Sequence, residues 1–444
     1  MSTTLVSDAV EPYAVAFDRL RGELPGGGRA LDVAGGAIER FGEIGFPDVR
    51  QEEWRFTDVA PIARTDFDMS PRPSDIGVAD LAPFSYRDCY RLVLVNGRLA
   101  PELSDLGSLP EGVEIRGLAE ALAAGSTAAE ADLGRHAAYV EHPFVALNTA
   151  LWRDGALVRV PRGVALDKPV NLVVLGTPGD EPMAFFPRLL VIAEESSQLT
   201  LVEQYATLGE GRYLSCPVTE IVAHPNAVVD HYKLQREANT AFHVATFQIH
   251  QERDSNVSSH SISWGGDLVR NDVNAVLAGE GCEANLNGLY LVEGDQLVDY
   301  HMRVEHVAPH CDSHELFKGI LEGSARSVFN GRIYVHPGAQ KTDAKQTSRN
   351  LLLSPDALCN ANPQLEIFAD DVKCTHGSTV GQLDDTAIFY LRSRGIGEEA
   401  ARSLLTYAFA ADIVERIRVP QVRQELEEFL FRRLPKGDIV RQAV

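Results

Sequence analysis

More than two hundred consecutive residues, from about Asp154 to about Gly381, have the pattern of short strands and almost no helical periodicity. Apolar runs such as "VNLVVLG" and "RLLVIAE" alternate with Gly, Asn, Asp and Pro, which is typical of strands of about five residues joined by turns. A run of strands this long fits a sandwich, a barrel, a propeller or a solenoid, so internal repetition has to distinguish between them.

One weak repeat is visible inside this segment. The stretch "NLNGLYLVEGDQLVDYH", from Asn285, aligns with "VFNGRIYVHPGAQKTDAKQ", from Val328, and Asn287-Gly288 matches Asn330-Gly331 at an offset of 43 residues. Two turns of a β-helix, at roughly 21 residues each, suit this offset, and so does a propeller blade of about 40–45 residues. The Gly-His and Trp-Asp marks of propellers are missing. We therefore expect a mainly β fold with a β-helix core over residues 154–383.

The two ends of the chain have helical patterns. Residues 1–153 contain "VEPYAVAFDRLRGEL" and "LDVAGGAIERFGEIG", with apolar residues at helical intervals, and one strand followed by an Asn-Gly turn in "CYRLVLVNGRLAPEL". Residues 384–444 contain amphipathic helices, one of which ends before Pro420. Its apolar face serves either to cap the open end of a solenoid or to dock a partner, and the pattern fits both uses.

Composition narrows the class of partner. The 444 residues include 63 acidic and 41 basic side chains, and the formal charge of −22 argues against nucleic acid and anionic membranes as partners. The N-terminal "MSTTLVSDAV" has no signal or transit pattern, and no apolar run approaches about 20 residues, so we expect a cytoplasmic protein without a membrane span. The six scattered cysteines are then expected to be free thiols.

Catalytic signatures are missing from the sequence. We find no phosphate-binding loop, no nucleophile elbow and no dinucleotide fingerprint, and therefore expect a protein that is not an enzyme. The alternative is a β-helix enzyme that acts on polysaccharides, which would need two carboxylates in a groove. The absence of a secretion signal argues against that alternative.

Histidines gather in two stretches of the strand-rich segment. His243, His250 and His260 lie in the first, and the second, "HMRVEHVAPHCDSH", contains His301, His306, His310 and His314. The last three would share one face only in a fully extended chain, which Pro309 argues against. We interpret these histidines as structural or surface residues.

The stretch "DDVKCTHGSTVG" has the residue types of half a metal site. Cys374 and His376 are two positions apart, but a closed zinc site needs about four ligands and no second pair follows. On spacing alone, a small buried cysteine and a turn histidine are the simpler interpretation.

This stretch also resembles a known family. The runs "KCTHG", "FYLRSRGI" and "LLTYAFAADIVERI" are similar to the C-terminal signature of the SufB/SufD proteins of the SUF iron-sulfur cluster assembly machine. The upstream "NGRIYVHPGAQKTDAKQTSRNLLLSPDA", "NANPQLEIFADDVK" and "EEWRFTD" resemble the same family. The SufB branch has a Glu-rich segment where this chain has Lys-Cys-Thr-His-Gly-Ser-Thr, so the resemblance is to the SufD branch.

The resemblance implies a right-handed parallel β-helix flanked by helical domains, in a non-catalytic scaffold that pairs with SufB and aids iron entry at their interface. Iron or a cluster would be held transiently between the subunits, with Cys374 and His376 from this chain, and no cofactor permanently. An ATPase of the SufC type would dock on the C-terminal helices, through Phe389, Tyr390, Arg392, Arg394, Leu404, Leu405, Phe409 and Ile413. A flavin in the complex and a homodimer of the isolated chain are left open.

Overall fold

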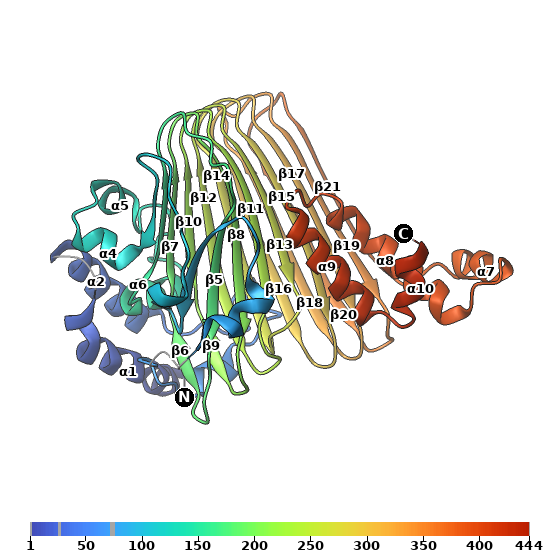
Figure 1. Ribbon diagram of the computed structural model, residues 1–444, viewed down its shortest axis with the longest axis horizontal. Coiled ribbons are helices and arrows are strands. Elements are labelled where there is room, and N and C mark those ends of the chain that lie inside the picture. Colours follow the sequence, from blue (N-terminus) through green and yellow to red (C-terminus); the bar gives the residue numbers. More distant parts are fainter. Residues whose placement is uncertain (1, 25–27, 72–75, 444) are drawn as a thin grey trace.

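Two long parallel β-sheets form the body of the computed structural model, which describes residues 2–24, 28–71 and 76–443. The chain crosses from one sheet to the other at every half turn, so β15 pairs with β17 in one sheet and β16 pairs with β18 in the other. Figure 1 shows the resulting solenoid, with helices at its two ends. The expectation of a mainly β fold built on a parallel β-helix is confirmed.

Strands β14 to β20 have ten residues each, whereas most of the earlier strands are shorter. The ten-stranded sheet contains β1 (Tyr90–Val95), β2 (Arg98–Leu99), β5 (Val170–Gly176), β8 (Gln198–Thr207), β11 (Val228–Arg236), β13 (Asn256–Ser263), β15 (Glu283–Val292), β17 (Asp312–Leu321), β19 (Asp343–Leu352) and β21 (Lys373–Gly381). The eleven-stranded sheet contains β3 (Glu114–Gly117), β4 (Gly155–Val160), β6 (Met183–Phe185), β7 (Arg188–Ala193), β9 (Tyr213–Ser215), β10 (Val218–Ala223), β12 (Phe242–Gln251), β14 (Leu268–Leu277), β16 (Leu297–His306), β18 (Arg326–Val335) and β20 (Leu358–Ile367).

The predicted turn length of roughly 21 residues is wrong. Glu283 pairs with Asp312 in one sheet and Leu297 pairs with Arg326 in the other, so one turn takes 29 residues in both places. The offset of 43 residues between the two Asn-Gly pairs therefore spans one and a half turns and relates strands of opposite sheets.

The error has a physical cause, because both Asn-Gly pairs lie inside strands and not at turns. A Cβ atom on Gly288 would be 2.2 Å from the ring of Phe317, its neighbour in the next turn. On Gly331, a Cβ atom would be 2.3 Å from the side chain of Gln346. These glycines make room for large side chains in the interior, whereas the sequence alone suggests that they bend the chain.

The N-terminal helices pack on the outer face of the eleven-stranded sheet. The helices of this region are α1 (Ser2–Leu20), α2 (Gly28–Ile44), α3 (Ala60–Ala63), α4 (Leu118–Ala123), α5 (Thr127–Asp132) and α6 (Pro143–Leu151). Phe41 and Leu147 share a buried cluster with Leu190 of β7 and Phe242 of β12. Strand β1 pairs in parallel with β5 and β3 pairs antiparallel with β4, so this region also supplies strands to both sheets. Within the described chain, no helix combines the length and apolarity that a membrane crossing requires.

The segment "EEWRFTD" is fastened to the outer face of the same sheet by a buried arginine. The guanidinium of Arg270 lies 3.6 Å from the ring centre of Trp54, and its Nη1 donates to the carbonyl of Glu53 at 2.8 Å and to Asp299 at 2.9 Å. Thr57 donates to the same Asp299 carboxylate at 2.5 Å. Cation–π stacking and paired charges thus hold this segment on β14 and β16.

The C-terminal helices cover the outer face of the ten-stranded sheet. They are α7 (Asp385–Ser393), α8 (Glu398–Val414), α9 (Pro420–Arg433) and α10 (Gly437–Ala443). Ile413 and Leu426 are buried with Leu234 of β11, Leu289 of β15 and Ile320 of β17. The helices therefore lie along the side of the solenoid, and α7 projects beyond them in Figure 1.

Candidate functional site

Cys374 and His376 lie on β21, the last strand of the ten-stranded sheet. On one side β21 pairs in parallel with β19, where Cys374 lies opposite Ala344 and His376 opposite Gln346. In the described chain no strand pairs with its other side, and β20 is likewise the last strand of the eleven-stranded sheet. The two residues are therefore at the open end of the solenoid.

Both side chains are on the inner face of the sheet. Ala344 and Gln346 are buried in the interior, and residues two apart on a strand point the same way. Cys374 is half-buried and packs against a small apolar cluster made of Ile333, Val335, Ala339, Ala344 and Ala369. Burial raises the pKa of the Cys374 thiol, so a metal ion has to displace its proton. His376 is exposed, because no further turn covers it.

A polar column continues inward from His376. The amide nitrogen of Gln346 donates to the carboxylate of Glu315, one turn deeper, at 2.6 Å. Burial raises the pKa of Glu315 to about 8, which keeps this carboxyl protonated at neutral pH. The column therefore offers neutral hydrogen-bonding groups behind His376, and it places no negative charge there.

The open end also exposes apolar surface and unpaired backbone. Leu358, Ile367, Phe368 and Val380 are between 39% and 55% exposed, although large apolar side chains in this fold are mostly buried. The N–H of Lys373 donates to the carbonyl of Thr342 in the preceding turn. Successive N–H groups of a strand point to opposite edges, so every second N–H from Cys374 onward, including that of Ser378, points to the free edge of β21. A strand from another chain can pair with such an edge.

Two ligands do not make a closed metal site. Among the residues that the structure describes, no three His, Cys, Asp or Glu side chains come together to hold a metal ion. Cys374 and His376 supply one thiol and one imidazole on the same face, a donor set suited to iron and iron-sulfur clusters. Further ligands would have to come from a second chain.

The predicted partner-binding residues fall into two groups. On α7, Phe389 is 71% and Tyr390 is 56% exposed. The guanidinium of Arg394 lies 5.2 Å from the ring centre of Tyr390, and Arg392 pairs with Glu398 at 3.3 Å. This half of the set forms an exposed aromatic and basic surface.

The residues on α8 are engaged by the chain itself. Ile413 is fully buried, and Leu404 and Phe409 pack on the same cluster over the ten-stranded sheet, whereas Leu405 is half-buried outside it. Lys318 of β17 pairs with Asp412 at 2.9 Å and donates to the carbonyl of Phe409 at 2.9 Å. The apolar face of α8 therefore holds the helix on the solenoid.

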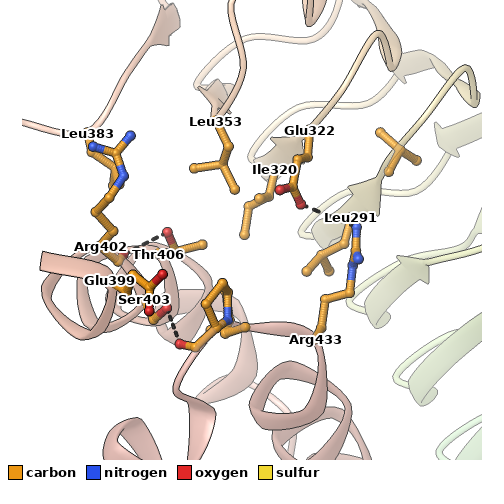
Figure 2. Close-up of a pocket in the computed structure, with 13 residues that line it drawn as sticks. Leu291, Ile320, Glu322, Leu353, Leu383, Glu399, Arg402, Ser403, Thr406 and Arg433 are labelled. Atoms are coloured by element: carbon orange, nitrogen blue, oxygen red, sulfur yellow. Dashed lines mark hydrogen bonds and ion pairs between the residues drawn. The ribbon is translucent and has the colours of Figure 1, made fainter.

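A pocket of about 150 Å³ marks the seam between these helices and the sheet (Figure 2). Leu291, Ile320 and Leu353 line its sheet side, and Arg402 and Thr406 of α8 line its helix side. Arg433 of α9 crosses the seam and pairs with Glu322 at 3.5 Å. One lining residue, Leu383, lies just after the end of β21, but the pocket shares no residue with the Cys374 and His376 site.

Most of the histidines in the two histidine-rich stretches have structural partners, while His310 lies in a corner between strands and His314 lies on β17. His306 is buried and its Nε2 lies 2.9 Å from Ser313 Oγ, while His301 lies 3.3 Å from the Asp299 carboxylate. His310 has a left-handed backbone, with φ of 58°, in the corner that separates His306 from His314. Burial lowers the pKa of His306 to about 4. His306, His310 and His314 therefore do not share a face.

In the first stretch, His243 lies 2.7 Å from Glu237, and His250 and His260 stack on His136 and Tyr232.

Comparison with known proteins assigns the family. Residues 175–409 match the model described as SUF system FeS cluster assembly, SufBD core domain, and residues 32–172 match the SufBD protein N-terminal region. An iron-sulfur cluster assembly SufBD family protein of Synechocystis is 33% identical over 402 residues, which are 88% of each chain. Iron-sulfur cluster assembly protein SufD of Escherichia coli K12 is 32% identical over 90% of this chain and 92% of its own. SufD of Bacillus subtilis is 30% identical over 66% of this chain and 67% of its own. The chain belongs to the SufB/SufD family of iron-sulfur cluster assembly proteins and resembles its SufD members.

Proposed function

We propose that the chain is a non-catalytic scaffold subunit that acts in the cytoplasm, pairs with a SufB-like subunit through the open end of its solenoid, and contributes Cys374 and His376 to a transient site for iron or a cluster. The observation that carries the proposal is the position of both residues on the last strand of the sheet, whose outer edge no strand of the described chain covers. Iron and sulfide are the cargo of this site, and the incomplete ligand set of Cys374 and His376 allows their release.

Two features support the pairing. The free edge of β21 offers backbone amides to an incoming strand, and the exposed side chains of Leu358, Ile367, Phe368 and Val380 offer apolar area around it. The same edge would allow two copies of the chain to pair when the other subunit is absent. The exposed aromatic side chains of α7 are the surface that we assign to an ATPase subunit, since Phe389 and Tyr390 have the exposure that a docking anchor needs.

The proposal is tested with the assembled complex. The chain is co-expressed with a SufB-like and a SufC-like protein, and the purified complex is given iron and sulfide without oxygen. We expect cluster absorbance that moves to an apo-ferredoxin on mixing. A complex that forms in full and yet assembles no transferable cluster would contradict the proposed function.

A further inference from the structure

Two cysteines outside the proposed site, Cys282 and Cys311, occupy the same position in adjacent turns. Cys282 precedes β15 and Cys311 precedes β17, and the N–H of Asp312 donates to the carbonyl of Cys282 at 2.9 Å. Neighbouring strands in a sheet are about 4.8 Å apart. That spacing lies within the range of about 4.4–6.8 Å between Cα atoms that a disulfide spans.

The two sulfur atoms approach the same acceptor. The Sγ atoms of Cys282 and Cys311 lie 3.1 Å and 3.2 Å from the carbonyl oxygen of Gly279. A hydrogen bond from the Cys311 thiol lowers the pKa of Cys282 to about 7, while the same contact raises the pKa of Cys311. At rest the Cys282 thiol donates to the carbonyl of Gly279, and its lowered pKa lets it lose that proton near neutral pH while Cys311 keeps its own. A thiolate beside a protonated thiol is the arrangement of a nucleophilic and a resolving cysteine.

The fold itself does not require cysteine at this corner. This position is the residue whose backbone carbonyl accepts an N–H of the next turn. In other turns it is occupied by Ser197, Ala227, Ser255 and Thr342. Ser255 Oγ donates to the carbonyl three residues earlier at 2.7 Å, as Cys282 does to Gly279, and Thr342 does the same at 3.0 Å. The packing at this corner needs only a small side chain. The redox reactivity of two adjacent thiols is therefore not required by the fold.

We propose that Cys282 and Cys311 are a thiol pair that a peroxide oxidises to a disulfide joining β15 to β17. The Cys282 thiolate attacks one peroxide oxygen, the O–O bond breaks, and the other oxygen leaves as water after taking up a proton. The Cys311 sulfur then attacks the sulfenic sulfur of Cys282, and the hydroxyl leaves as a second water. One peroxide is reduced to two waters, and two thiols become one disulfide.

Access to the pair is through the corner loops. Both cysteines are buried, but Glu280 and His310 lie exposed in the loops that precede them. Hydrogen peroxide is little larger than water, so a small opening of these loops is enough to admit it. The inference is independent of the proposed cluster site, because no step involves Cys374 or His376.

The test maps disulfides in the folded, full-length chain after treatment with hydrogen peroxide. The chain is quenched, unfolded, alkylated and digested, and the peptides are identified by mass spectrometry. We expect the Cys282 and Cys311 peptides to be joined, two hydrogen atoms lighter than the separate peptides. Cys216, which is buried and donates to the carbonyl of Phe144 at 3.5 Å, is the internal control and should stay reduced.

Two variants use residues that other turns already have at this corner. Cys282→Ser and Cys311→Ala should fold and should each remove the joined peptide. The map of the unmodified chain decides the question even if a variant fails to fold. Both thiols still alkylated after peroxide treatment, a Cys282 sulfinic acid beside a reduced Cys311, or disulfides only between separate chains would each overturn the proposal.

Discussion

His376 lies opposite Gln346 in the register of the ten-stranded sheet, and Gln346 donates to Glu315 one turn further inside. The imidazole is therefore the outermost member of a polar column that ends at the edge of β21. Its place depends on the length of the solenoid, because one more turn would have buried it. We infer that this end of the chain is built to be completed by another subunit.

The buried carboxyl of Glu315 makes the fold sensitive to pH. Its pKa is about 8 in the folded chain, against an ordinary value of 4.5. The folded chain holds a proton that the unfolded chain releases, so this contribution to stability is full below about pH 4.5 and is lost as the pH rises to about 8. Within that window it falls by about 1.4 kcal/mol per pH unit.

Glu315→Gln should remove that part of the pH dependence, since the amide cannot ionise. Urea unfolding at several pH values measures it, with Glu181→Gln, an exposed site, as the control. Identical pH profiles for the Glu315→Gln variant and the unmodified chain would show that Glu315 does not titrate in the fold.

The buried face of α8 should contribute several kcal/mol to the free energy of unfolding. Ile413→Ala removes a fully buried side chain from the cluster over β11, β15 and β17, and we expect a loss of about 2–5 kcal/mol in the free energy of unfolding. Leu405→Ala on the same helix, half-buried and outside that cluster, should cost less than about 1 kcal/mol. Equal losses in the two variants would mean that α8 is not held by this face.

Truncation of α7 aromatic side chains should separate partner binding from folding. Phe389→Ala and Tyr390→Ala should leave the unfolding midpoint unchanged, because both rings are exposed, and should weaken capture of the ATPase subunit by about 2 kcal/mol or more. Val15→Ala, at an exposed apolar residue of α1, is the matched control. Binding that is the same for all three variants and the unmodified chain would refute this assignment.

A proline at the free edge of β21 should block pairing with a second subunit. Ser378 directs its N–H away from β19, so Ser378→Pro removes one donor from the free edge and none from the bonds to β19. Ser378→Thr keeps that donor and serves as the control. In size-exclusion chromatography we expect the proline variant to stay apart from the SufB-like subunit and the threonine variant to join it. A proline variant that still co-elutes would remove the edge of β21 from the interface.

The sequence predicts the architecture of the fold better than the number of residues in each turn of the solenoid. Apolar runs separated by small and polar residues indicate a solenoid, and helical periodicity marks both ends, because these patterns depend on neighbouring residues alone. The turn length is not predictable in the same way, since Asn287-Gly288 and Asn330-Gly331 look like turns but give space to Phe317 and Gln346.

The candidate site is predictable only in part. Cys374 and His376 become candidates through the resemblance of "KCTHG" to the SufB/SufD signature, because their spacing alone favours a structural interpretation. Glu315 and Gln346 come from strands about thirty residues apart, and only the register of β17, β19 and β21 brings them into line. The amphipathic pattern of α8 likewise indicates an apolar face but does not say that the chain's own sheet covers it. The polar column behind His376 and the covering of α8 by the sheet both depend on contacts between residues that are distant in sequence.

Reconstitution of cluster on matched complexes tests whether His376 is a ligand at a subunit interface. Complexes with the unmodified chain and with His376→Ala are brought to the same stoichiometry and thermal midpoint, and iron and sulfide are added without oxygen. We expect the His376→Ala complex to form normally, because an exposed ring contributes little to stability, and to assemble at most a small fraction of the cluster. Equal cluster yield in the two complexes would show that His376 is not a required ligand.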